Sequence, residues 1–240
     1  MMKICVIGNS HVGALKRGWA NINGNFPGIE VTFFANRGQG LDRLGVCNGK
    51  LSPSDTVMAR ALEVTSGGKN NIDPSEYDVI LIYGAGTTGV GVANDTQFYS
   101  RAVIESILTD SIITTTGFRI LKKLRAVTDK VVLVGHAPLP AATQLVSNGF
   151  PSDYIDRIER INNLIYCPLN SKLIMQPIST IVNGNNTHPE LSKGSKQLAV
   201  GDSYDDWYHP ADDTIHMNAR FGEIWLTEFL NNYAKEADPK

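Results

Sequence analysis

The sequence predicts a single three-layer α/β/α sandwich built around a central, mostly parallel, five-stranded sheet. Its apolar runs are continuous rather than alternating, which is typical of strands covered on both faces. Helical patterns alternate with these runs, as in doubly wound α/β domains. The 240 residues are enough for one large domain with a substantial core. We therefore expect one domain over residues 1–240.

Five short runs rich in β-branched and apolar residues are the expected strands. In chain order they cover residues 3–8, 30–34, 78–83, 130–135 and 172–176. The first four read KICVIG, EVTFF, DVILIY and KVVLVG, and the fifth, KLIMQ, is the weakest. Valine, isoleucine and phenylalanine favour these segments because their side chains pack well on a pleated surface.

Helical patterns fill the intervals between these strands. We expect helices over residues 12–22, 97–128, 154–166 and 218–234, with a break in the second one near 114–117. The isoleucines of the third helix recur close to the 3.6-residue period of a helix. In the last helix one apolar stripe is formed by Phe221, Ile224, Trp225 and Phe229.

Two insertions, at residues 48–71 and 183–210, are rich in glycine, serine, asparagine and proline. Such composition predicts loops. Loops on a rigid α/β scaffold often carry the functional residues, so we expect these two insertions to border the site.

Composition excludes several classes of function. The chain carries 22 basic and 24 acidic residues and has no basic run, which argues against a nucleic-acid partner. No apolar stretch reaches the roughly 18 residues of a membrane span, and no signal-peptide pattern precedes the first strand. The three cysteines, Cys5, Cys47 and Cys167, match neither a zinc site nor a disulfide framework. We expect a soluble cytoplasmic protein with free thiols and no membrane partner.

The first candidate for chemistry is Ser10, in the sequence Gly8-Asn9-Ser10-His11 at the end of the first expected strand. Open α/β sheets bind ligands at the carboxyl ends of their strands. The helix that follows would direct backbone N–H groups and its positive dipole end towards a developing negative charge. The alternative is that Ser10 only caps that helix, because serine is a preferred N-cap residue.

The second candidate is the D-x-x-H spacing of Asp213 and His216, just before the last expected helix. A turn with this spacing can place both side chains on one side, so that the carboxylate holds the imidazole in one tautomer. A general base for acyl transfer requires that arrangement. The neighbouring Asp212 is a second carboxylate that could meet the imidazole, and a plain acidic loop with a solvated histidine is the alternative.

Together, the two candidates resemble the SGNH (GDSL-type) hydrolase family, which has its serine in an N-terminal G-D-S block and its Asp and His in a C-terminal D-x-x-H block. The resemblance implies the flavodoxin-like fold of that family and a triad of Ser10, His216 and Asp213. It also implies a serine esterase that deacylates a small or carbohydrate-linked ester, with neither cofactor nor metal.

The chain departs from the family pattern at two positions. Asn9 stands where the family has Asp, and Gly86 stands where the G-x-N block has its oxyanion-binding asparagine. The family's second block has a glycine after the second strand, which corresponds here to residues 36–40. The resemblance makes the N–H of Gly40 the preferred oxyanion donor, with Gly38 second and the Ser10 N–H contributing. These glycines could equally serve only to permit a turn. A backbone N–H, Asn9 or a residue from an insertion could substitute for the missing asparagine.

The departures leave other functions open. A degenerate member of the family could bind a glycan or acyl group without catalysis. Gly84–Gly89 spells G-x-G-x-x-G after an apolar strand, so a nucleotide-cofactor site is a further, weaker alternative. The literal tripeptide at Gly201–Ser203 would make Ser203 a rival nucleophile, but it lacks a preceding strand. The G-x-S-x-G elbow of α/β-hydrolases is absent.

Three further residues could line a substrate pocket. His11 adjoins the proposed nucleophile, His136 follows the fourth expected strand, and Trp207 lies in the loop before Asp213 with Tyr208 beside it. The favoured alternative for His136 is a structural loop histidine, and the two aromatic residues could equally form a hydrophobic clasp. A metal site built from the remaining histidines, His188 and His209, has no supporting ligand spacing.

Overall fold

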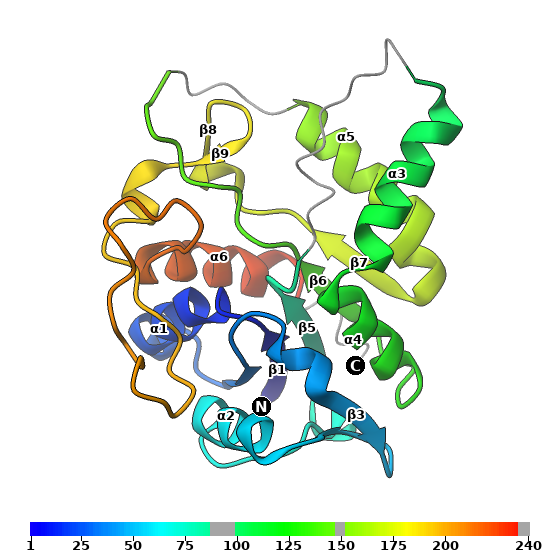
Figure 1. The fold of residues 1–240 in the computed structure, drawn as a ribbon, viewed down its shortest axis with the longest axis vertical. Helices are drawn as coiled ribbons and strands as arrows, with labels where there is room; N and C mark the ends of the chain where they lie inside the picture. Colours follow the sequence, from blue (N-terminus) through cyan, green and yellow to red (C-terminus); the bar gives the residue numbers. More distant parts are fainter. Residues whose placement is uncertain (87–98, 147–151, 235–240) are drawn as a thin grey trace.

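The computed structural model describes residues 1–86, 99–146 and 152–234, and its centre is one five-stranded sheet (Figure 1). The strands lie in the order β2-β1-β5-β6-β7, and each of the neighbouring pairs is parallel. Their bounds are Met2–Gly8 for β1, Ile29–Ala35 for β2, Val79–Tyr83 for β5, Val132–Gly135 for β6 and Ser171–Ile174 for β7. The predicted fold class is therefore confirmed.

Helices cover both faces of this sheet. Alternation along β1 sends Ile4 and Val6 to one face and Cys5 and Ile7 to the other, and all four are buried. The first face packs on α1 (Val12–Ile22) and α6 (Ala219–Asn232). The second face packs on α2 (Thr56–Ser66), α3 (Arg101–Ile113), α4 (Thr116–Arg125) and α5 (Ser152–Ile161), which completes the three layers (Figure 1). None of the described helices is both long and apolar enough to cross a membrane.

The carboxyl ends of the central strands line up at one edge of the sheet. Gly8 pairs with Ala35 on one side and with Tyr83 on the other, and Tyr83 pairs with Gly135. After β1 the chain goes to β2 on one side and later returns to β5 on the opposite side. The strand order reverses there, and at such a point open α/β sheets form a crevice. Ser10 follows directly after this end of β1.

Helices α1 and α6 pack with their backbones in close approach. A Cβ atom on Gly222 would lie 2.0 Å from the Ala14 carbonyl oxygen, and one on Gly18 would lie 2.4 Å from the Glu223 nitrogen. Only glycine permits such proximity. The packing brings together the segments that precede the two helices, although they are far apart in the sequence (Figure 1).

The prediction of a loop at residues 48–71 is wrong. The strand β4 (Lys50–Pro53) pairs with β3 (Leu44–Cys47), and helix α2 follows. Asp55 caps that helix by accepting a hydrogen bond from the Met58 N–H, and Gly67 ends it with a positive φ of 80°. The glycine and serine residues that suggested a loop therefore lie at the ends of the helix, and its buried face is short.

The other predicted elements need smaller adjustments. The break in the long helical pattern lies at Thr114–Thr115, where Thr115 caps α4. The predicted helix at residues 154–166 consists of α5 followed by a turn of π-helix over Asn162–Tyr166. Within residues 183–210 the regular elements are only the short strand β9 (Asn186–Thr187) and a 3-10 turn over Pro189–Leu191.

Candidate active site

Three side chains from the two ends of the chain meet beyond the carboxyl end of β1. Ser10 Oγ lies 3.0 Å from His216 Nε2, and His216 Nδ1 lies 2.9 Å from Asp213 Oδ2. If the Nδ1–H donates to the carboxylate, Nε2 is left to accept the hydrogen of the Ser10 hydroxyl. The side chains of His216 and Asp213 are 23% and 14% exposed, so the group is reachable but partly desolvated.

The backbone around Ser10 is held in a tight turn. Asn9 accepts hydrogen bonds from the His11 N–H through its side chain and from the Val12 N–H through its carbonyl. A Cβ atom on Gly84 would lie 2.7 Å from His11 Cβ, so only glycine fits there. Asn9 thus has a structural role in the turn. Helix α1 has no side-chain cap, which makes the capping alternative for Ser10 wrong.

Asp213 organises the other half of the site. Its Oδ1 accepts hydrogen bonds from the N–H groups of Ile215 at 2.7 Å and His216 at 2.9 Å, while Oδ2 faces the imidazole. Burial alone would raise the pKa of Asp213, but the hydrogen bonds from His216 and Ile215 outweigh it and lower the pKa below its usual range. The carboxylate is therefore ionised at neutral pH. Asp212 is exposed and does not replace it.

The oxyanion donors differ from the expectation. The Gly40 N–H donates to the Arg37 carbonyl at 3.1 Å, and the Gly86 N–H donates to the Gly84 carbonyl at 2.8 Å. Both are engaged in turns, and an oxyanion would have to displace those carbonyls. In the described part of the chain, the N–H groups of Ser10 and Gly38 have no acceptor. The Ser10 N–H lies beside the nucleophile itself.

Two more imidazoles contact the ring of His216. The His11 ring lies 5.2 Å away, and burial, followed by the neighbouring His216, lowers the pKa of His11 to about 3, so it stays neutral. The His209 ring stacks on His216 with centroids 3.9 Å apart and planes 4° apart. His209 is the residue that sequence reasoning missed, and its only signal is its place four residues before Asp213.

His209, Asp213 and His216 are residue types that can ligate a metal ion. Ligand atoms of His209, Asp213 and His216 lie within 4.8 Å of one another. A metal ion, however, binds in the plane of each imidazole that ligates it, about 2.0–2.1 Å from the nitrogen. Two rings stacked in parallel have no shared plane in which one ion could lie. This arrangement of the rings does not fit a shared metal.

Several other sequence-predicted residues have different roles. His136 is only 3% exposed, and its ring nitrogens pair with the Tyr154 hydroxyl at 2.6 Å and the Ala137 carbonyl at 2.5 Å. It belongs to a buried polar network, which agrees with a structural role for this loop histidine and not with contact with substrate. Gly84 donates its N–H to the Gly135 carbonyl and so joins two strand ends. The rest of the proposed nucleotide loop, residues 87–89, lies outside the described residues.

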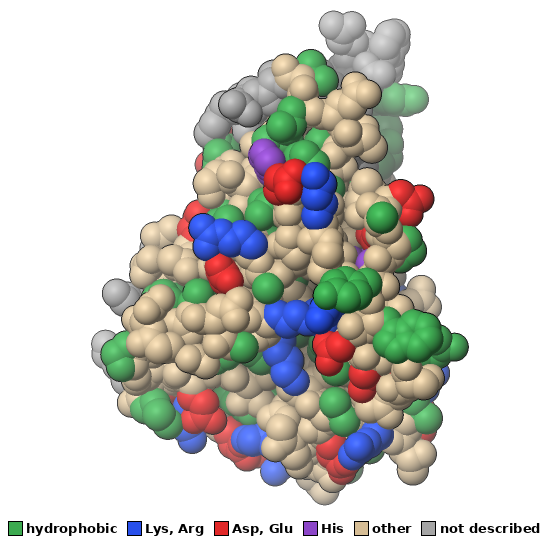
Figure 2. All heavy atoms as spheres, turned by 90° about the vertical axis from the view of Figure 1, so that its left-hand side faces the viewer, with side chains coloured by type: hydrophobic (Ala, Val, Ile, Leu, Met, Phe, Trp, Pro, Cys, Tyr) green, Lys and Arg blue, Asp and Glu red, His purple; other side chains and the backbone are tan. Residues whose placement is uncertain are grey.

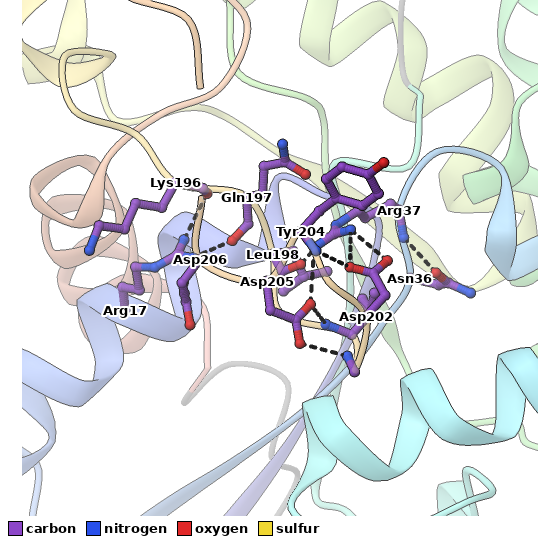
Figure 3. Close-up of polar contacts among 12 residues, drawn as sticks. Arg17, Asn36, Arg37, Lys196, Gln197, Leu198, Asp202, Tyr204, Asp205 and Asp206 are labelled. Atoms are coloured by element: carbon purple, nitrogen blue, oxygen red, sulfur yellow. Dashed lines mark hydrogen bonds and ion pairs between the residues drawn. The ribbon is translucent and has the colours of Figure 1, made fainter. Parts of the chain in front are cut away.

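The loop that carries Ser203 is held by two arginines, and we call residues 196–209 the clamped segment (Figure 3). Arg37 bonds both carboxylate oxygens of Asp202 and also contacts Asp205. Arg17 bonds Asp206 at 2.7 Å. Both arginines also bond backbone carbonyls of the segment, which are those of Lys196, Gln197 and Leu198.

The clamped segment is exposed on its outer side. Ser203 is exposed there and is not part of the group of imidazole rings formed by His209 and His216. Trp207 is 58% exposed and meets Tyr204 edge to face, so it stands outside the group formed by Ser10, Asp213 and His216. Figure 2 shows basic and acidic side chains interspersed on this face of the molecule, with bulky hydrophobic side chains between them.

No protein-family model matches the sequence, and no curated protein matches it. The similar solved structures include the periplasmic domain of a lipopolysaccharide acetyltransferase from Salmonella ser. Paratyphi A, with 12% identity, a TM-score of 0.47, and 95% of this chain and 82% of that chain covered. The lipase Lip_vut3 from a goat rumen metagenome has 12% identity, a TM-score of 0.39, and coverage of 96% and 97%.

A third similar structure is a flavoprotein in complex with FMN from Lactobacillus acidophilus NCFM. It has 16% identity and a TM-score of 0.26, and the match covers 72% of this chain and 91% of that chain. All three TM-scores lie below 0.5. Similarity at this level does not indicate the function of this chain.

Proposed function

We propose that this protein is a serine esterase in which Ser10, His216 and Asp213 act as a catalytic triad. The observation that carries the proposal is the unbroken chain of contacts from Ser10 Oγ through His216 to Asp213, at 3.0 and 2.9 Å. A hydroxyl, an imidazole and an ionised carboxylate in this order are the components of acyl transfer. The substrate class, a small or carbohydrate-linked ester, is carried over from the resemblance to SGNH hydrolases.

In the first half of the reaction, Ser10 Oγ attacks the acyl carbon while its proton moves to His216 Nε2. The tetrahedral intermediate collapses, the bond to the alcohol oxygen breaks, and the proton passes from His216 to the departing alcohol. In the second half, water attacks the acyl-serine and gives a proton to His216. That proton returns to Ser10 Oγ as the carboxylic acid leaves. Asp213 keeps the imidazole oriented throughout.

Two features of the site bear on the rate. The Ser10 N–H is free to stabilise the oxyanion, but the glycine N–H groups at positions 40 and 86 are engaged in turns. Loss of one oxyanion donor typically costs about 10²–10³ in turnover. We therefore expect a slow esterase. The same deficit favours the second candidate, a non-catalytic protein that binds a glycan or acyl group.

Labelling with a fluorophosphonate probe separates the two candidates. An esterase should be labelled and should hydrolyse p-nitrophenyl acetate, and Ser10→Ala should abolish both. Ser203→Ala is the matched control, since Ser203 is an exposed serine outside the triad and its loss should change neither. A wild-type protein that is neither labelled nor active would favour the binding protein. Labelling that persists in Ser10→Ala would overturn the assignment of the nucleophile.

A further inference from the structure

The carboxylate of Asp213 faces two imidazoles rather than one. Its Oδ2 lies 2.9 Å from His216 Nδ1 and 3.4 Å from His209 Nδ1. The two rings are parallel within 4°, with their centroids 3.9 Å apart. His209 thus touches both the group that would orient the base and the face of the base itself.

His209 is built firmly into this position. Its backbone N–H donates to the Ser195 carbonyl at 2.9 Å, and the Asp213 N–H donates to the Pro210 carbonyl at 3.0 Å. Its side chain is only 11% exposed. The clamped segment that carries it is fastened by Arg37 and Arg17, so the ring is held from its own side and does not depend on His216 alone.

We propose that His209 is a positioning residue for the esterase reaction, which holds the ring of His216 in line with Ser10 and borders the carboxylate of Asp213. This inference rests on the proposed function. The stacked face limits rotation of His216 about its side-chain bonds. His209 Nδ1 lies 3.4 Å from Asp213 Oδ2, so a second polar ring atom borders the carboxylate that orients His216.

The surroundings of His209 favour its neutral form. It faces His216 and Asp213 within the site, Arg17 from α1, and Arg37 from the segment after β2. Burial, followed by the proximity of His216, lowers the pKa of His209. His216 itself faces Ser10, His11, His209 and Asp213. Among these rings, a positive charge that forms on His216 would meet neutral neighbours.

Two substitutions separate the two contributions of His209. His209→Phe keeps a flat ring for stacking but removes the ring nitrogen that lies 3.4 Å from Asp213. His209→Asn keeps an N–H donor at a similar distance from the backbone but removes the ring. His188→Asn is the matched control, because His188 also precedes a proline in the same insertion and lies outside the site.

With p-nitrophenyl acetate as substrate, we expect His209→Asn to lower kcat roughly tenfold or more, because the base loses its alignment. His209→Phe keeps a flat ring stacked on His216 and should keep kcat within a few-fold of wild type. His188→Asn should leave kcat unchanged.

A second readout does not require activity. The nitrogen chemical shifts of the His216 ring report which nitrogen carries the hydrogen, and His209→Asn should reduce the preference for Nδ1–H. Wild-type kcat and ring shifts in His209→Asn would overturn the role of His209. A wild-type protein without esterase activity would instead overturn the proposed function, and the ring shifts would still decide whether His209 orients His216.

Discussion

Replacing Gly222 with alanine should disturb the candidate site from a distance. The Cβ atom of the new side chain would lie 2.0 Å from the Ala14 carbonyl oxygen, while ordinary contact begins near 3.4 Å. Helices α1 and α6 would have to separate by roughly 1.4 Å to relieve the overlap. Ser10 precedes α1 and His216 precedes α6, so their 3.0 Å contact would be strained by the same displacement.

The expected effects follow from that displacement. Overpacking of this kind costs about 1–3 kcal/mol in the free energy of unfolding. In a helix without steric conflict, alanine in place of glycine would instead stabilise by about 0.5–1 kcal/mol, so the sign of the change is diagnostic. Misplacement of reacting groups by about 1 Å can lower the rate of acyl transfer by roughly 10²-fold.

Urea unfolding and hydrolysis of p-nitrophenyl acetate measure the two effects on the same preparation. Gly24→Ala is the matched control, because a Cβ atom on Gly24 would have nothing within 4 Å. We expect Gly24→Ala to retain wild-type stability and activity. If Gly222→Ala were as stable and as active as the control, the idea that close helix packing joins Ser10 to His216 would be refuted.

Four further outcomes are expected. Asp213→Asn should lower kcat by roughly 10³–10⁴ in the esterase assay, because the imidazole loses the carboxylate that selects its tautomer. Arg37→Ala should release the clamped segment, which would be detected as faster proteolysis within it and a lower Tm. Arg37→Lys should restore little of the lost Tm, since one ammonium group cannot reproduce the forked contacts of the guanidinium. Hydrogen bonding from Arg119 lowers the pKa of Asp42, so the ionised Asp42 carboxylate should stabilise the folded protein above pH ~4. That stabilisation should be lost as the pH falls through the lowered pKa, and the difference in Tm between wild type and Asp42→Asn should shrink over the same range. Burial lowers the pKa of His11 from 6.5 to about 3, so below pH 6.5 the unfolded chain binds a proton that the folded chain does not. The free energy of unfolding of wild type, measured in urea, should therefore fall by up to about 1.4 kcal/mol per pH unit below pH 6.5 relative to that of His11→Gln.

Much of the fold could be predicted because its signals are local. Continuous apolar runs identified the five strands, and the stripe of Phe221 and Trp225 identified the last helix. Helix α2 was missed because only a few of its residues, such as Met58 and Leu62, are buried, and glycine and serine surround it.

The site was predictable only where one side chain implies its own chemistry. Ser10 lies at the carboxyl end of a predicted strand, where open α/β sheets bind ligands, and it was paired with His216 only through the resemblance to SGNH hydrolases. The donors at Gly40 and Gly86 could not be judged, since whether an N–H is free depends on turn geometry. The stacking of His209 depends on how the arginines fasten the clamped segment, a long-range arrangement that has no local pattern.

The contact between Ser10 and His216 can form only late in the synthesis of the chain, because the two residues are 206 positions apart. The hydroxyl of Ser10 leaves the ribosome first, and its partner imidazole is translated 206 positions later. At ~5–20 residues per second, the nascent chain would wait roughly 10–40 seconds before the pair could assemble. During that interval the hydroxyl of Ser10 lacks the imidazole of His216, so under the proposed function esterase activity would begin only after the segment that carries His216 has been made and folded.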